Sequence, residues 1–241
     1  MGSINNSLQF GSVDSADYGI LISGEGTFNA PERDVDTIEI PGRNGDLLID
    51  KGRFKNITVK YTAYSYAEDM ASFRQQLSDF RNALTSQAGY QRLTDTFHPD
   101  EYRLATFISG FEVKPLQYNT LAEITLQFSC KPQRFLTSGE NQVTVANNGT
   151  ITNPTLFESL PIIETQGAGT LTINNSTITI TNTGKTILDS EMMEAYMEEN
   201  GAIIPKNDSV SGEFPKLQSG ANTVSRTGIT SVKITPRWWT L

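Results

Sequence analysis

The sequence has a single cysteine and a single histidine among its 241 residues. Cys130 has no second cysteine to pair with, which excludes an intrachain disulfide and a cysteine-based metal cluster. Its place in an alternating apolar segment predicts a small, buried core residue. His98 lies in a proline-containing turn, residues 97–101, without a serine or cysteine nucleophile motif beside it. We therefore interpret His98 as structural or solvated rather than catalytic.

Long apolar runs and an excess of basic residues are also missing. No segment approaches the length of a transmembrane helix, and the N-terminus lacks the basic and apolar regions of a signal peptide. We expect a chain made and kept in a cytosol, or released from one, with no membrane partner. The net charge of −8 argues against nonspecific binding to nucleic acid. Residues 1–135 hold 13 basic and 17 acidic residues and the remainder holds 6 and 10, so each part carries −4.

Motifs for catalysis or cofactor binding are absent as well. Gly24-Glu25-Gly26 lacks the third glycine and the following helix of a phosphate-binding loop. Glu191, Glu194 and Glu198 would line one face of a helix, and paired carboxylates can hydrolyse glycosides. Nothing nearby raises the pKa of one of these groups above the others, so we interpret them as a solvated acidic face. The sequence predicts no catalytic residue, no cofactor and no metal site.

One long helix is predicted, in the segment from Ser65 to Gly89. Its apolar residues recur at steps of three and four, which places them on one helical face: Met70, Phe73, Leu77, Phe80 and Leu84. Ser65 and Glu68 fit a capping box, and Gly89 fits a C-terminal cap. The pattern predicts a helix over about residues 66–88 that buries this stripe against a sheet.

Several strands are predicted before and after this helix. Residues 7–24 contain a first strand, and residues 24–36 read as a loop. Asn44-Gly45 is a strong two-residue turn signal that would set Ile40 opposite Ile49 in a hairpin. Residues 54–63 alternate as a half-buried strand. Two further strands are predicted, with apolar faces formed by Phe107, Ser109, Phe111 and Val113 and by Ile124, Leu126, Phe128 and Cys130.

The amino-acid composition changes after residues 137–139, which resemble a linker: Asn, Thr, Gly and Ile become dominant. Short strands separated by frequent turns predict an all-β sandwich. The segments 171–173 and 178–180 would form a hairpin with a four-residue loop that pairs Ile173 with Ile178. Residues 186–200 are ambiguous, since Met192–Glu198 could be helical whereas Ile187 and Leu188 favour a strand. A last strand is expected at Val232 and Ile234.

Trp238 and Trp239 follow this last strand. Exposed tryptophans can stack on sugars, so the pair supports the hypothesis of a stand-alone carbohydrate-binding, lectin-like module. Adjacent residues of a strand point to opposite faces, so at most one tryptophan should be displayed and the other should be core.

Several separate stretches match, in order, the siphophage distal tail (Dit) proteins of Gram-positive hosts. Residues 18–61 and Asp79–Ala105 carry most of the resemblance, followed by Cys130–Leu136. Ile151–Ile163 and Ile234–Trp238 carry it more weakly. Several stretches in order are more specific than any one motif, and the N-terminal part carries most of the resemblance.

The resemblance implies a mainly β fold with two domains. Residues 1–136 would be a ring-forming N-terminal β domain with the one long helix, and residues 137–241 a galectin-like β-sandwich. It also implies the function of a structural hub at a phage tail tip, without enzymatic activity. A homo-hexamer, as one ring or two stacked rings, would join the tail tube to the adsorption apparatus and let DNA pass without specific binding.

The other implied partners are the tail tube protein, a tail-associated lysin or tail fibre protein, and a receptor-binding protein. The location would be the virion, at the tail tip, after synthesis in the cytoplasm of the bacterial host. The hairpin tip is the proposed subunit interface, formed by Arg43, Asn44, Gly45, Asp46 and Arg53. Their charges could pair with carboxylates of a neighbouring subunit.

Overall fold

The computed structural model describes residues 6–24, 27–116, 118 and 120–241. Glu25 and Gly26 of the glycine-containing segment, and the first five residues of the predicted N-terminal domain, lie outside the described residues. The chain divides into two compact units, residues 1–134 with Leu241, and residues 135–240. Among the described residues, no helix is both long and apolar enough to span a membrane.

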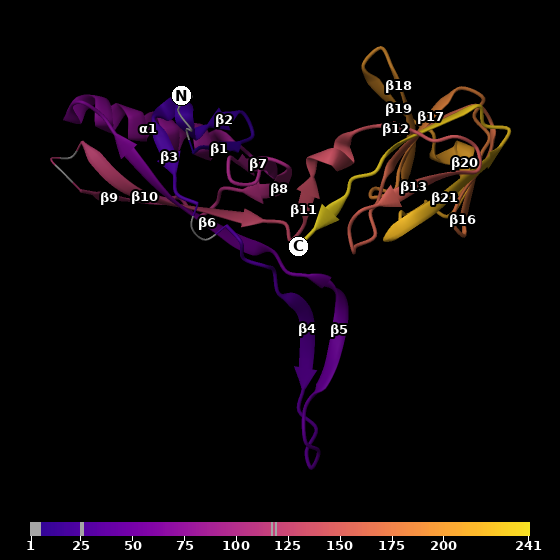
Figure 1. Cartoon of the computed structure of the whole chain (residues 1–241), viewed down its shortest axis with the longest axis horizontal. Helices are drawn as coiled ribbons and strands as arrows, with labels where there is room; N and C mark the ends of the chain where they lie inside the picture. The colour runs from indigo at the N-terminus through magenta and orange to yellow at the C-terminus, as the bar shows by residue number, and fades with distance from the viewer. Residues whose placement is uncertain (1–5, 25–26, 117, 119) are drawn as a thin grey trace. The chain divides into compact units, whose positions relative to one another are not determined.

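The N-terminal unit is a β structure with one α-helix among its described residues (Figure 1). Its elements, in chain order, are β1 (Leu8–Phe10), β2 (Val13–Asp14), a 3-10 turn (Ser15–Tyr18), β3 (Ile20–Ile22), β4 (Arg33–Ile38), β5 (Leu47–Phe54), β6 (Ile57–Tyr66), α1 (Met70–Ser86), β7 (Gln91–Asp95), β8 (Glu101–Thr106), β9 (Phe111–Pro115) and β10 (Leu121–Cys130). The main sheet has the strand order β2-β1-β7-β8-β10-β6-β3, and β9 pairs with β10. Its described strands pair in antiparallel fashion.

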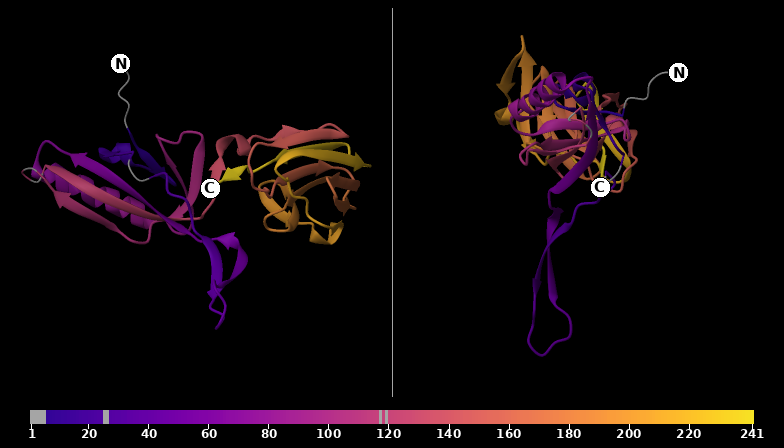
Figure 2. Two further views of the ribbon diagram at one scale, coloured as in Figure 1. Left: turned by 60° about the horizontal axis from the view of Figure 1, so that its bottom comes forward. Right: turned by 90° about the vertical axis from the view of Figure 1, so that its left-hand side faces the viewer.

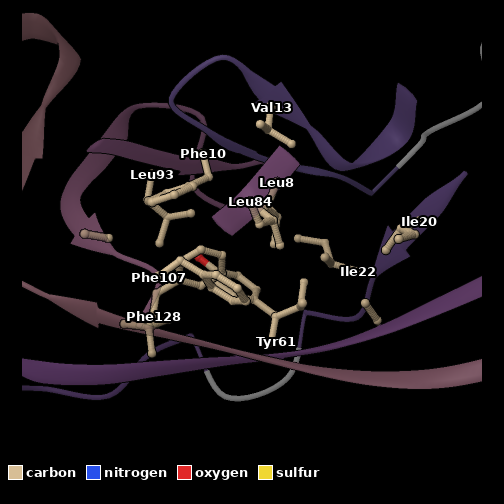
Figure 3. Packing of buried hydrophobic residues seen from close by; sticks show 14 of the residues in the cluster. Leu8, Phe10, Val13, Ile20, Ile22, Tyr61, Leu84, Leu93, Phe107 and Phe128 are labelled. Carbon is tan, nitrogen blue, oxygen red and sulfur yellow. The ribbon is translucent and has the colours of Figure 1, made fainter. Parts of the chain in front are cut away.

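The long pair β6–β10 forms the centre of this sheet. It runs without a break from Ile57 opposite Cys130 to Tyr66 opposite Leu121. The predicted alternation is confirmed, because every second residue of β10, including Cys130, is buried. The core lies between this sheet and α1, and Figure 3 shows Phe10, Phe107 and Phe128 packed together within it.

The helix begins later than the sequence pattern predicts. It spans Met70–Ser86 rather than about 66–88, and its N-cap is Asp69, whose carboxylate accepts from the backbone N–H groups of Ala71 and Ser72. Ser65 is a buried residue of β6. The strand continues past the predicted cap because β10 offers it backbone partners as far as Leu121.

Four of the five predicted stripe residues face the interior. Phe73, Phe80 and Leu84 are buried and Leu77 is partly buried, but Met70 is half exposed in the first turn. The helix ends at Ser86, and its C-cap is Gln87 instead of the predicted Gly89. The expected single strand through Phe107–Val113 is also wrong, because Gly110 has a left-handed backbone (φ 69°) that separates β8 from β9.

The C-terminal unit is a sandwich of two antiparallel sheets. Its elements are β11 (Arg134–Leu136), a 3-10 turn (Thr137–Glu140), β12 (Val143–Thr144), β13 (Gly149–Asn153), β14 (Ile162–Gln166), β15 (Gly169–Ile173), β16 (Ser176–Ile180), β17 (Lys185–Asp189), β18 (Glu194–Glu199), β19 (Ala202–Pro205), a 3-10 turn (Asn207–Ser209), β20 (Val210–Gly212), β21 (Gly220–Thr227), β22 (Ser231–Thr235) and β23 (Trp239–Thr240). One sheet has the order β12-β22-β14-β17-β18-β19 and the other β13-β21-β15-β16-β20. The fold is mainly β, with a single long helix in the described part of the chain, as predicted.

Two local predictions for this unit are wrong, and the structure decides one alternative that the sequence left open. Residues 137–139 belong to a 3-10 turn in which Gly139 is buried, so they are not a free linker. The hairpin after β15 has a two-residue loop, in which Asn174 adopts φ 53°, and it pairs Leu171 with Ile178. Residues 186–200, left open between a helix and a strand, contain strands: β17 and β18 pair as a hairpin, so the carboxylates of Glu194 and Glu198 do not line a helical face.

Candidate assembly surface

Strands β4 and β5 form a two-stranded ribbon, called here the arm (residues 33–54). They pair with each other and, among the described strands, with no other strand. Figures 1 and 2 show the arm leaving the rest of the N-terminal unit in each view. The ladder runs from Ile38 opposite Leu47 to Arg33 opposite Phe54, with an irregularity between Arg33 and Val35. A two-stranded ribbon alone is marginally stable in water, so the arm is a segment suited to a partner.

The turn at the end of the arm differs from the predicted one. The strands stop at Ile38 and Leu47, so the loop has eight residues and Ile40 does not pair with Ile49. Pro41-Gly42 forms a β-turn in which the N–H of Arg43 donates to the carbonyl oxygen of Ile40 at 3.1 Å. Gly42 has φ 82°, as the third residue of a type II turn after proline requires. This turn ends the ladder before Asn44-Gly45 can close a two-residue hairpin.

Ion pairs hold the base of the arm together. The Nε of Arg53 donates to Asp34 at 2.7 Å, and this hydrogen bond lowers the pKa of the Asp34 carboxyl. Lys51 lies 2.8 Å from Asp36, which raises the pKa of Lys51. Arg33 pairs with Asp50 across the strands. Arg53, predicted to reach a neighbouring subunit, is therefore already engaged within its own arm.

The outer half of the arm exposes large aliphatic side chains. Leu48 is 61% exposed, and Ile38, Leu47 and Ile49 are each 45–47% exposed. Ile38 is opposite Leu47 and lies on the same face as Ile49, whereas Leu48 points to the other face. Sequence reasoning did not select these residues. The signal was present, because three apolar residues in succession place apolar groups on both faces of a strand.

The predicted tip residues are all at the surface. Arg43, Asn44, Gly45 and Asp46 are exposed, and within residues 6–24, 27–116, 118 and 120–241 no side chain pairs with Arg43 or Asp46. The structure thus brings four of the five predicted residues together at the end of the arm. Arg53 lies at its base instead.

The two tryptophans have different environments, as the alternation predicts. Trp238 is buried in the core of the C-terminal unit. Trp239 is partly exposed, and its ring stacks on Phe157 with centroids 4.4 Å apart. Its Nε1 donates to the carbonyl oxygen of Glu158 at 2.9 Å. One face of the Trp239 ring is therefore covered, and Trp238 is not available to a sugar.

The fold is that of solved phage hub and baseplate proteins. The structure of SPP1 Dit, described as a paradigm of the hub adsorption apparatus in Gram-positive infecting phages, matches with a TM-score of 0.73. That match has 13% identity and covers 98% of this chain and 99% of the SPP1 chain. The phage P2 baseplate in its calcium-activated conformation matches with a TM-score of 0.53, 8% identity and coverage of 95% and 97%. No family model and no curated protein matches the sequence.

Proposed function

We propose that this chain is the structural hub of a phage tail tip. The observation that carries the proposal is the similarity of fold to SPP1 Dit over nearly the full length of both chains. In this proposal six copies close into a ring, which joins the tail tube protein to a tail-associated lysin or fibre and a receptor-binding protein. The N-terminal domain forms the ring, and the C-terminal domain is the galectin-like sandwich. The protein is a virion component without enzymatic activity.

The arm is the proposed contact between neighbouring subunits. Its aliphatic side chains are half exposed in a single chain, and the side chains of Arg43 and Asp46 at its tip have no partner within the described residues. Burial of such apolar surface stabilises an interface by about 25 cal/mol per Å². A stable contact of this kind buries on the order of 1,600 Å² in total. A head-to-tail contact repeated around an axis closes into a ring when its rotation divides a full turn.

The ring is tested by size-exclusion chromatography with multi-angle light scattering. We expect the mass of a hexamer or of two stacked hexamers, with the monomer appearing only on dilution. A strict monomer at every concentration, including after mixing with the tail proteins, would refute the ring.

The role of the arm is tested by two variants. Arg43→Glu reverses a charge at the tip, and Leu48→Lys removes an exposed aliphatic group; both should weaken assembly. Neither side chain is buried in the single chain, so the melting temperature of the monomer should stay nearly constant. Lys216→Glu is the control, because its surface pair with Glu158 lies in the other unit. Unchanged assembly in both arm variants would contradict this interface.

A ring at a tail tip must let double-stranded DNA pass without retaining it. The net charge of −4 in residues 1–135 supports a neutral or acidic lumen, which would repel the phosphate backbone. Fluorescence anisotropy with double-stranded DNA at low salt should detect no binding by the assembled ring. Micromolar binding that weakens steeply with added salt would show a basic lumen and overturn this part of the proposal.

A further inference from the structure

The N-terminal unit contains a small cavity with a volume of about 20 Å³. Charged and polar side chains from a loop, a turn and strands line it, among them Thr27, Asp95, His98, Glu101, Arg103 and Arg134. A cavity needs roughly 10–15 Å³ to hold one water-sized particle. This one therefore has room for a single small ligand.

Arg103 is a buried charge beside the cavity. Alternation along β8 directs it inward, in the same row as Ala105, and it is only 7% exposed. Its Nη1 donates to the carbonyl oxygen of Pro132 at 3.4 Å, and its Nη2 has no hydrogen-bond partner among the described residues. Burial lowers the pKa of Arg103, and the positive charge of Arg134 lowers it further. The guanidinium thus lacks a direct counter-charge.

Two more unpartnered groups belong to the same lining. Arg134 donates through Nη2 to the carbonyl oxygen of Thr27 at 2.8 Å and lies 3.4 Å from Glu101 through Nη1. Its Nε and the hydroxyl of Thr27 are both buried, and neither has a hydrogen-bond partner within the part of the chain that is described. Leaving a buried donor unpaired costs about 1–3 kcal/mol, and more for a charged group.

The nearby carboxylates are already engaged. Asp95 accepts from the hydroxyl of Tyr61 at 2.7 Å, from the backbone N–H groups of Phe97 and His98 at 2.9 Å, and lies 3.0 Å from Nδ1 of His98. Glu101 pairs with Arg134. Neither carboxylate is within ion-pair distance of Arg103 in the described structure. His98 leaves its Nε2 without a partner in the same region.

We propose that this cavity is a binding site for a single monatomic anion of the size of chloride. Arginine N–H groups can only donate, and the Thr27 hydroxyl can also donate. A halide accepts from all three groups and supplies the missing negative charge, whereas a water molecule accepts only two hydrogen bonds and brings no charge. A monatomic ion needs only one water-sized position, and about 20 Å³ provides it. The bound anion would join Thr27, which precedes the arm, to β8 and to the end of the N-terminal unit.

The test compares thermal unfolding in sodium chloride and in sodium gluconate at equal ionic strength, followed by the helical circular dichroism of α1. The wild-type midpoint should be higher in chloride by on the order of 5 °C. Arg103→Met should lose this difference between the salts, while Arg81→Met, an exposed change on α1, should keep it. General effects of the salts act on all variants alike, so a change in the chloride–gluconate difference between variants reports the cavity.

Two further measurements keep the test decisive if Arg103→Met fails to fold. Thr27→Val removes one donor and should reduce the chloride-dependent shift. Crystals grown in sodium bromide should show an anomalous peak within hydrogen-bond distance of Arg103 and Arg134. The proposal would be overturned if Thr27→Val showed the same difference in unfolding midpoint between chloride and gluconate as the wild type. Density for a water molecule without an anomalous peak would also overturn it.

Discussion

The contact between α1 and the sheet yields the most direct stability prediction, through Phe80→Ala. Phe80 is completely buried at the middle of the helix. Its ring lies 5.4 Å from that of Tyr18 and 5.9 Å from that of Phe111, measured between centroids. Truncation to alanine removes both contacts and leaves a cavity under the helix.

The expected loss is about 3–5 kcal/mol in the free energy of unfolding of the N-terminal unit, the range for a buried phenylalanine changed to alanine. Alanine is itself a strong helix former, so the loss reports packing and not helix propensity. Met70→Ala is the matched control on the same helix. Met70 is 51% exposed, so its truncation should change the stability by less than about 0.5 kcal/mol.

Urea unfolding can follow the two units separately. The helical circular dichroism signal comes from α1, whereas both tryptophans lie in the C-terminal unit and report its unfolding by fluorescence. Phe80→Ala should lower the midpoint of the first signal and leave the second unchanged. A loss below about 0.5 kcal/mol in the first signal would mean that the stripe on α1 is not buried.

Three further predictions concern single side chains. Burial raises the pKa of Asp189, but the hydrogen bonds and charge of Arg237 outweigh it and keep the pKa below 3.8. The C-terminal unit should therefore lose stability as the pH falls below that value. Arg237→Met should weaken this pH dependence in unfolding followed by fluorescence. Burial raises the pKa of the Cys130 thiol to about 11, so iodoacetamide should label it at neutral pH only after unfolding, as mass spectrometry would show. Gly169→Ala would place a Cβ 2.0 Å from the carbonyl oxygen of Thr227, and should cost more than about 2 kcal/mol in urea unfolding; a neutral effect would contradict the backbone geometry.

Local periodicity determined the elements and their buried faces. The step of three and four residues identified the helix and its inward stripe, and the alternation in β10 identified Cys130 as core. The buried faces were predicted correctly even where the predicted strand pairing was wrong. The predicted register of the β15–β16 hairpin was shifted by two residues, yet Leu171, Ile173, Ile178 and Ile180 are all buried as expected. A shift of two residues preserves the face of every side chain, because the period of a strand is two.

Tertiary structure decided what depends on neighbours distant in sequence. Ser65 could have capped a helix, but the ladder with β10 keeps it in a strand. Arg103 reads as an ordinary surface charge, and only the enclosure of β8 makes it a buried guanidinium without a counter-charge. Leu47, Leu48 and Ile49 in the arm form an aliphatic run typical of a core strand, and their exposure follows from the absence of a third described strand beside β4 and β5. Sequence fixes which way a side chain points, whereas its surroundings depend on which other segments the fold brings there.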